Sequence, residues 1–199
     1  SLQNNDIATI TYTSGTTADP KGVVLTHRNY TANVEQALSV VSIPSTWRTL
    51  IILPLDHCFA HVVGFYIMIA CGASVATTEV GRTPMETLKN IPIAIREVRP
   101  MLMLSVPTLA RNFRKNIETS IKAKGKTIER LYEFALNNAI KYNKEYWNRG
   151  GLQAWRWPLV KLFDKLIFKA VRDGFGGRMR FFVGGGALLD IELQRYFCA

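Results

Sequence analysis

Short continuous apolar runs recur along the first hundred residues and alternate with stretches of helical periodicity. The runs at residues 50–53 and 101–104 contain almost no polar positions, a pattern typical of strands that are buried on both faces. Residues 59–71 predict an apolar helix, and residues 72–76 predict the next strand. This alternation predicts an α/β fold with a largely parallel sheet covered by helices.

Weaker patterns flank these elements. Residues 6–10 combine apolar and β-branched positions and predict a strand, whereas residues 30–41 predict a helix. Thr26 is a suitable N-cap for a helix at this point of the chain. Residues 85–98 have mixed helical character, which Pro92 should interrupt because proline removes a backbone donor.

The pattern changes after residue 109, and no strand is predicted before residue 173. Helical periodicity covers residues 109–122, 128–147 and 159–171, with glycine and proline breaks between them. The sequence therefore predicts a single domain over residues 1–199 with a helical region at about 109–175.

The net charge of +10 is concentrated in this helical region. Between Arg111 and Arg180 there are 17 Lys/Arg and 6 Asp/Glu, and the remainder of the chain is almost balanced. Charged helix faces of this kind are usually solvated. A module that binds nucleic acid or another anionic surface is the alternative, ranked well below because no recognition motif is present.

Composition and residue spacing argue against a membrane-spanning protein, a secreted protein and a protein metal site. No segment reaches the roughly 18 to 20 apolar residues that a membrane-spanning helix needs, and the first residues do not resemble a secretory signal. Cys58, Cys71 and Cys198 lack the spacing of a metal or redox site. His57 and His61 are four residues apart without the glutamate of the metalloprotease pattern, so we expect no protein metal site. A reducing, cytoplasmic compartment fits best.

Residues 11–22 carry the candidate chemistry, because this stretch holds hydroxyls, two glycines and a lysine with little bulk. Such a loop can present backbone N–H groups and hydroxyls to a phosphate, while Lys21 supplies a point charge. The Walker motif is absent, since Pro20 stands at its second glycine and Gly22 at its hydroxyl residue. A surface turn rich in Ser, Thr and Gly is the plainer alternative.

The same stretch resembles the signature Tyr-Thr-Ser-Gly-Thr-Thr-Gly-x-Pro-Lys-Gly of the AMP-forming adenylating enzymes, with Ala18 in place of its second glycine. The resemblance implies that this loop binds the β- and γ-phosphates of ATP with Mg²⁺. The residues implied are Thr13, Ser14, Gly15, Thr16, Thr17 and Lys21. Of these, Thr16 and Lys21 are the implied catalytic residues, because they would stabilise charge on the leaving pyrophosphate.

Two further segments are similar to this family. A predicted strand at residues 180–183 leads into Gly184-Gly185-Gly186-Ala187-Leu188, which resembles the family loop Ser-Gly-Gly-Ala-Pro. The resemblance implies that Gly185, Gly186 and Ala187 pack on the adenylate. Residues 54–59 resemble Pro-Leu-x-His-x-Phe, which implies a substrate-binding role for His57. A final helix is predicted at residues 191–198, with Asp190 as its N-cap.

The helical region at about residues 109–175 resembles an insert of the long-chain fatty acyl-CoA synthetases, and the resemblance implies that residues 1–199 are a partial adenylation domain with this helical insert. The resemblance implies a ligase that activates a fatty acid with ATP and transfers it to coenzyme A, releasing AMP and pyrophosphate. An adenylating enzyme for an aryl or amino acid remains the alternative. Because the family's Mg²⁺-binding glutamate and C-terminal lysine have no counterpart here, we expect the isolated chain to be inactive.

The insert also combines aromatic and basic residues. Trp147, Trp155 and Trp157 lie within it, together with most of the lysines of the basic region. Such a mixture would suit peripheral contact of the protein with the inner face of an anionic membrane. The plainer alternative is that the aromatic side chains anchor the insert to the core.

Overall fold

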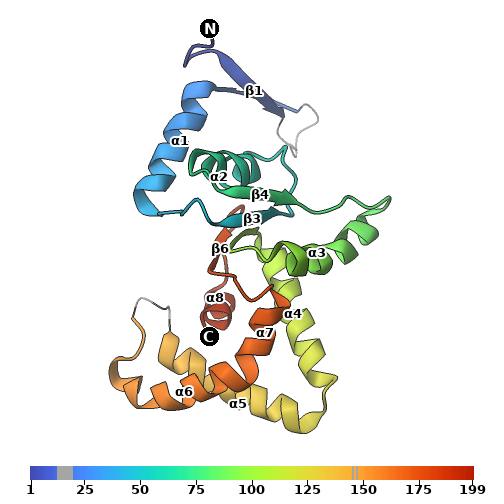
Figure 1. Cartoon of the computed structure of the whole chain (residues 1–199), viewed down its shortest axis with the longest axis vertical. Helices are drawn as coiled ribbons and strands as arrows, with labels where there is room; N and C mark the ends of the chain where they lie inside the picture. Colours follow the sequence, from blue (N-terminus) through green and yellow to red (C-terminus); the bar gives the residue numbers. More distant parts are fainter. Residues whose placement is uncertain (13–19, 145, 147) are drawn as a thin grey trace. The chain divides into compact units, whose positions relative to one another are not determined.

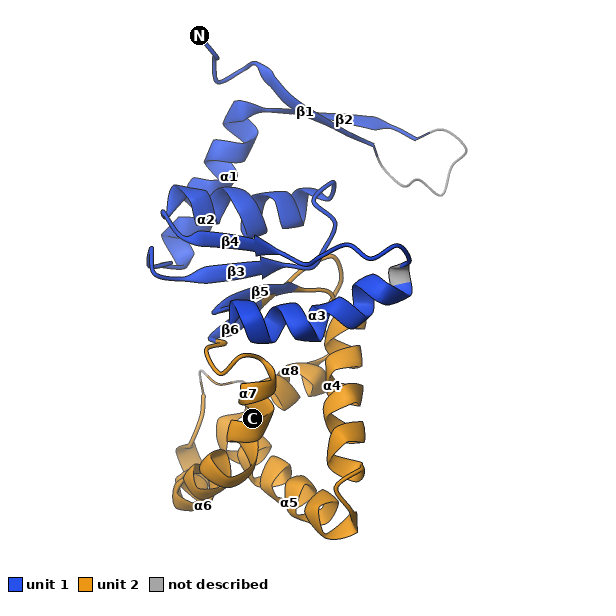
Figure 2. Cartoon of the chain, turned by 45° about the vertical axis from the view of Figure 1, so that its right-hand side comes forward, with its two compact units in different colours: residues 1–104, 180–182 blue, residues 105–179, 183–199 orange. Residues whose placement is uncertain are grey.

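A computed structural model describes residues 1–12, 20–144, 146 and 148–199. The chain forms two compact units (Figure 2). Unit 1 comprises residues 1–104 and 180–182, and unit 2 comprises residues 105–179 and 183–199.

The described strands form a hairpin and a four-stranded sheet (Figure 1). In the hairpin, β1 (Ile7–Tyr12) pairs antiparallel with β2 (Gly22–Thr26). The sheet has the order β4-β3-β5-β6, in which β3 pairs in parallel with both β4 and β5. Its strands are β3 (Arg48–Ile51), β4 (Ser74–Thr77), β5 (Leu102–Ser105) and β6 (Phe181–Gly184). The predicted α/β fold is confirmed.

Both faces of the two central strands are covered. Consecutive residues of a strand point to opposite faces, yet Thr49, Leu50 and Ile51 of β3 are all buried. The same holds for residues 102–104 of β5. β3 starts two residues before the predicted run because its polar residues find partners: Arg48 Nη1 donates to Val98 O at 3.0 Å, and Thr49 Oγ1 donates to Leu102 O at 3.0 Å.

The helices of unit 1 begin and end near the predicted positions. They are α1 (His27–Val40), the π-helix η1 (Ala60–Tyr66), α2 (Ile67–Ala70) and α3 (Pro84–Val98). Thr26 caps α1 as predicted, because its Oγ1 accepts a hydrogen bond from the Asn29 N–H. A Cβ at Gly64 of η1 would lie 3.2 Å from side-chain atoms of Ile51 and Leu104, so glycine allows η1 to lie close to the sheet.

The predicted interruption at Pro92 is wrong, because α3 runs through this residue. Pro92 is exposed, while Ile91 and Ile95 anchor the helix in the core. The carbonyl that loses its partner to the proline ring belongs to Leu88, which is also exposed, so water can bind it.

Unit 2 consists of helices around an aromatic core. They are α4 (Pro107–Lys122), α5 (Lys126–Asn143), the 3₁₀-helix η2 (Gly151–Arg156), α6 (Trp157–Phe163), the π-helix η3 (Asp164–Phe168), α7 (Lys169–Gly174) and α8 (Ile191–Cys198). In the core, the hydroxyls of Tyr132 and Tyr196 are 2.7 Å apart and hydrogen-bonded. Whether these helices are an insert in a larger domain stays a prediction.

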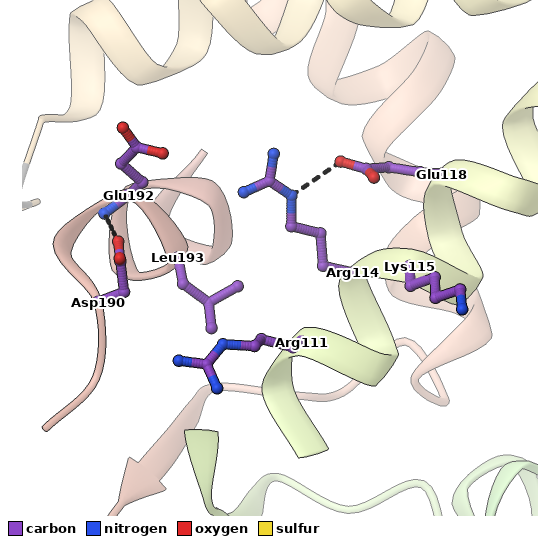
Figure 3. Close-up of a pocket in the computed structure, with 7 residues that line it drawn as sticks. All are labelled: Arg111, Arg114, Lys115, Glu118, Asp190, Glu192 and Leu193. Carbon is purple, nitrogen blue, oxygen red and sulfur yellow. Dashed lines mark hydrogen bonds and ion pairs between the residues drawn. The ribbon is translucent and has the colours of Figure 1, made fainter. Parts of the chain in front are cut away.

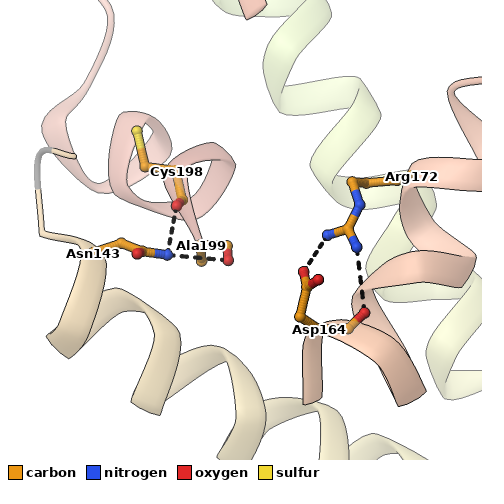
Figure 4. A network of polar contacts seen from close by, with 5 residues as sticks. All are labelled: Asn143, Asp164, Arg172, Cys198 and Ala199. Carbon is orange, nitrogen blue, oxygen red and sulfur yellow. Dashed lines mark hydrogen bonds and ion pairs between the residues drawn. The ribbon is translucent and has the colours of Figure 1, made fainter. Parts of the chain in front are cut away.

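The end of α8 is tied to α5 by a side-chain amide. Asn143 Nδ2 donates to Cys198 O at 2.8 Å and to Ala199 O at 3.3 Å (Figure 4). Asn143 is buried, so these bonds satisfy a polar group whose burial would otherwise be costly.

Cys58, Cys71 and Cys198 form no disulfide among the described residues. Within the described residues, no helix is both long and apolar enough to cross a membrane.

Candidate functional site

The predicted phosphate loop lies between the strands of the hairpin. Thr13, Ser14, Gly15, Thr16 and Thr17 lie outside the described residues. At the base of the loop, Tyr12 pairs with Gly22 across the hairpin. A Cβ at Gly22 would lie only 3.1 Å from Ile10 Cγ2, so glycine lets the two strands approach here.

Lys21 stands immediately before β2 and is exposed. The hairpin therefore fixes the backbone on both sides of the loop, at Tyr12 and at Gly22. The sequence predicts no strand between this loop and the helix cap Thr26. Instead, β2 lies between the loop and α1, because Val23, Val24 and Leu25 pair with β1.

His57 lies in the connection that follows β3 and precedes η1, and it is exposed. Its Nδ1 accepts a hydrogen bond from the Phe59 N–H at 3.2 Å. A neutral His57 therefore carries its proton on Nε2, which can donate to an oxygen of a ligand. His61, by contrast, stacks on Tyr66 with ring centroids 4.7 Å apart and packs beside Tyr30, which is a structural role.

The glycine loop follows β6 directly. Gly185 N donates to Ser105 O at 3.2 Å, and Gly186 has a φ of 81°, a conformation that favours glycine. A Cβ at Gly184 would meet nothing within 4 Å, so this position opens onto free space. Gly186 and Ala187 are exposed. This bare main chain leaves room for a flat ligand, and the packing of an adenylate on it stays a prediction.

The predicted residues are distributed over both units. Lys21 and His57 belong to unit 1, whereas Gly185, Gly186 and Ala187 belong to unit 2. His57 follows the end of β3, and the glycine loop follows the end of β6. The carboxyl ends of strands are where open α/β sheets bind ligands. Across the described positions, no group of three His, Cys, Asp or Glu side chains could hold a metal ion.

Sequence reasoning did not anticipate a pocket of about 260 Å³ within unit 2 (Figure 3). It is lined by Arg111, Arg114, Lys115 and Glu118 of α4 and by Asp190, Glu192 and Leu193 at the start of α8. Three basic residues on one turn of an amphipathic helix are the only signal for it in the sequence.

The charges in this pocket largely compensate one another. Arg114 Nε donates to Glu118 Oε1 at 2.8 Å, and this hydrogen bond raises the pKa of the Arg114 guanidinium. The same guanidinium lies 4.8 Å from the ring centroid of Tyr196. Asp190 Oδ1 accepts from the Glu192 N–H at 2.7 Å and caps α8, as predicted. These contacts are those of a structural junction between α4 and α8.

Comparison with known proteins decides the family. The model of the AMP-binding enzyme family matches residues 1–198, which is nearly the whole chain. The chain belongs to the AMP-binding enzyme family. This membership agrees with the resemblance carried by residues 11–22 and 183–188.

Relatives of this chain include long-chain acyl-CoA synthetases. Long chain acyl-CoA synthetase 8 of Arabidopsis thaliana is 32% identical over 96% of the chain, and the chain covers 26% of that protein. Long-chain-fatty-acid–CoA ligase FadD15 of Mycobacterium tuberculosis is 31% identical over 98% of the chain, which covers 31% of the ligase. The chain thus spans about a quarter to a third of the length of these relatives.

Among solved structures, that of McyG A-PCP complexed with phenylalanyl-adenylate has a TM-score of 0.51 and 24% sequence identity. The match covers 59% of this chain and 18% of that chain. At this identity the likeness concerns the fold alone, and it agrees with the parallel sheet of β3, β4 and β5.

Proposed function

We propose that the chain is part of a long-chain fatty acid–CoA ligase. The reaction joins a fatty acid carboxylate to the α-phosphate of ATP with loss of pyrophosphate. The thiol of coenzyme A then attacks the acyl-adenylate and releases AMP. The observation that carries the proposal is the similarity to long-chain acyl-CoA synthetases over 96% and 98% of the chain at about 30% identity. The activity is proposed for the whole ligase, because the chain covers only part of these relatives.

In the first step, negative charge develops on the leaving pyrophosphate. We assign the binding of its β- and γ-phosphates to residues 13–17 and Lys21, with Thr16 and Lys21 as the catalytic pair. The position of Lys21 supports this assignment, because Lys21 directly precedes Gly22, which pairs with Tyr12 in the hairpin. A positioned donor or cation stabilises the leaving group most where water is partly excluded.

The acyl-adenylate needs a flat surface and a polar group near its reacting carboxylate. We assign the first to Gly185, Gly186 and Ala187, supported by the open space beside Gly184 and the positive φ of Gly186. We assign a positioning role at the carboxylate to His57. The ring of His57 is exposed, and its Nδ1 already accepts a hydrogen bond from the Phe59 N–H. Nε2 is therefore the ring atom that can donate to a substrate oxygen.

The family resemblance implies that Mg²⁺ binds together with ATP. The ion would neutralise charge on the phosphates of ATP. The described residues include no cluster with the ligands such an ion needs. Coenzyme A is proposed as a co-substrate on the strength of the relatives alone.

Acid-dependent exchange of labelled pyrophosphate into ATP tests the proposal, because it reports the first step without requiring coenzyme A. The full-length protein should support exchange with palmitate and much less with butyrate, benzoate or phenylalanine. Preference for benzoate or phenylalanine would replace the proposal by an aryl- or amino-acid-adenylating function. Absence of exchange with every acid would overturn it.

A further inference from the structure

Unit 2 exposes large apolar side chains on the segment from η2 to α7. Leu152 is 94% exposed, Leu166 is 68% exposed, and Trp155 is 66% exposed. Lysines and further apolar side chains lie between them in the sequence. We define the basic aromatic face as Leu152, Trp155, Trp157, Lys161, Leu162, Lys165, Leu166 and Lys169, all of which are exposed.

These leucines are not needed for the core of unit 2. Phe163 and Phe168 occupy that core, and both are 7% exposed. Their spacing of five residues matches the i→i+5 hydrogen bonding of the π-helix η3, which brings both rings to the inner side. Leu162 and Leu166 are left outside, so the segment is apolar on two sides. A helix of this kind usually meets a second apolar surface.

The aromatic residues of the face carry cations on their rings. The Arg156 guanidinium lies 4.2 Å from the ring centroid of Trp155, and Lys161 Nζ lies 4.8 Å from that of Trp157. Nearby in the sequence, the exposed Tyr146 holds Arg149 at 5.2 Å. Each pair places a positive charge beside an amphipathic ring. Trp147 lies outside the described residues.

The charge of this segment is strongly one-sided. Residues 151–174, from η2 to α7, contain Arg156, Lys161, Lys165, Lys169 and Arg172 but only two acidic residues, Asp164 and Asp173. The Asp164 carboxylate is already paired with Arg172. Arg172 donates one hydrogen bond to Oδ1 of Asp164 and another to the backbone carbonyl of Asp164 (Figure 4). Lys161, Lys165 and Lys169 therefore lie in a segment whose basic residues outnumber its acidic residues by five to two.

We propose that the basic aromatic face docks the protein on an anionic phospholipid bilayer. Tryptophan rings prefer the headgroup level, lysines attract anionic lipids, and leucines insert into the acyl boundary. A protein partner fits less well, because lysine is depleted at protein interfaces. A nucleic acid fits less well because exposed leucines gain nothing from a phosphate backbone. This inference does not depend on the proposed ligase activity.

Vesicle sedimentation with the full-length protein tests it. The protein should pellet with vesicles of phosphatidylcholine and phosphatidylserine but not with pure phosphatidylcholine. Raising the salt from about 0.1 to about 1 M, which shortens the Debye length from about 10 to about 3 Å, should release it. Changing Lys161, Lys165 and Lys169 to Glu should weaken partition by at least about a hundredfold, since each basic residue near the surface contributes about a factor of five.

Two matched variants separate this inference from a general charge effect. Changing Arg28, Lys89 and Arg96 to Glu alters the net charge equally on exposed positions of unit 1, and binding should be retained. Leu162→Ser with Leu166→Ser keeps every charge and should weaken binding by at least about tenfold. Each variant should keep the wild-type Tm, which shows that it remains folded. Each should also keep pyrophosphate exchange, so that a failure of membrane binding can be distinguished from a failure of the proposed ligase activity.

Three outcomes would overturn the inference. One is equal pelleting of the wild type and the Lys161, Lys165 and Lys169 variant. Another is equal binding to neutral and anionic vesicles. The third is no binding by the wild type. If sedimentation then shows a dimer that the Leu162 and Leu166 changes dissociate, the face serves a second copy of the chain.

Discussion

The two units bury their apolar residues in different ways. In unit 1, β3 and β5 place every residue from 49 to 51 and from 102 to 104 inside, whether it points to one face or the other. In unit 2, the core is an assembly of helix side chains around Tyr132 and Tyr196, and the segment from η2 to α7 keeps a second apolar side exposed.

This difference separates two kinds of function. In unit 1, paired strands hold the backbone at Tyr12 and Gly22 and at the start of the connection that contains His57, so residues there can be positioned accurately for chemistry. The helices of unit 2 can be apolar on two sides, and the outer side is available to a partner without loss of the core. Of the residues assigned to ATP and substrate, Lys21, His57 and residues 185–187 lie outside helices and strands, whereas the proposed docking residues lie on helices.

One pair of equal substitutions gives the largest expected contrast. Leu50→Ala in β3 removes a fully buried side chain and should lower the free energy of unfolding by about 2–5 kcal/mol. Leu162→Ala removes the same atoms from a side chain that is 51% exposed and should cost less than about 0.5 kcal/mol. Urea unfolding measures both. A large cost at Leu162 would show that the basic aromatic face is packed rather than free.

The catalytic side of the comparison rests on Lys21. Lys21→Ala should lower the rate of adenylation by about 10²- to 10³-fold, because a lost donor at a developing charge commonly costs that much. Lys89→Ala, an exposed lysine of α3, is the control and should have no effect. Single-turnover formation of the adenylate measures the step. If Lys21→Ala stays within about threefold of wild type, well short of that cost, the loop is only a turn.

A smaller effect is expected at the tyrosine pair of unit 2. Tyr132→Phe or Tyr196→Phe leaves one buried hydroxyl without its partner, which should cost about 1–3 kcal/mol. The double variant replaces both groups by apolar ones of similar shape and should be nearly as stable as wild type. Urea unfolding of all four proteins completes the cycle. Additive costs in the double variant would contradict a direct hydrogen bond.

The smallest effect is a pH dependence in the same core. Burial raises the pKa of both Tyr132 and Tyr196 above the ordinary value. Below the unfolded pKa of about 10 both states are protonated, and the stabilisation is complete. As the pH rises above about 10, the unfolded tyrosines ionise first and stability falls. The Tyr132→Phe, Tyr196→Phe double variant should lose stability less steeply in urea unfolding above that pH, and an unchanged slope would exclude the pair as its cause.

Much of unit 1 could be predicted from the sequence, because local patterns and buried runs agree there. The runs at residues 50–53 and 101–104 gave the central strands, and Thr26 gave the start of α1. The errors came from tertiary partners. Arg48 and Thr49 are polar, yet they enter β3 because Val98 O and Leu102 O accept their hydrogen bonds.

Unit 2 was less predictable for two physical reasons. Phe163 and Phe168 share the core through a π-helical turn, whereas periodicity arguments assume 3.6 residues per turn. The Tyr132–Tyr196 hydrogen bond joins positions that are 64 residues apart, and no local pattern marks it. Of the candidate site, the motifs located Lys21, His57 and residues 185–187. Their roles stay predictions, because residue types alone do not fix the geometry around a ligand.

Hydrogen exchange with a non-hydrolysable palmitoyl-adenylate analogue tests the central claim most directly. If the loops carry the chemistry, the analogue should slow exchange of backbone amides at residues 11–22 and 183–188 of the full-length protein. Residues 151–172 of the basic aromatic face should exchange at their original rates. Protection confined to residues 151–172, or no protection in either loop, would contradict the assignment of catalysis to the loops and of docking to the helices.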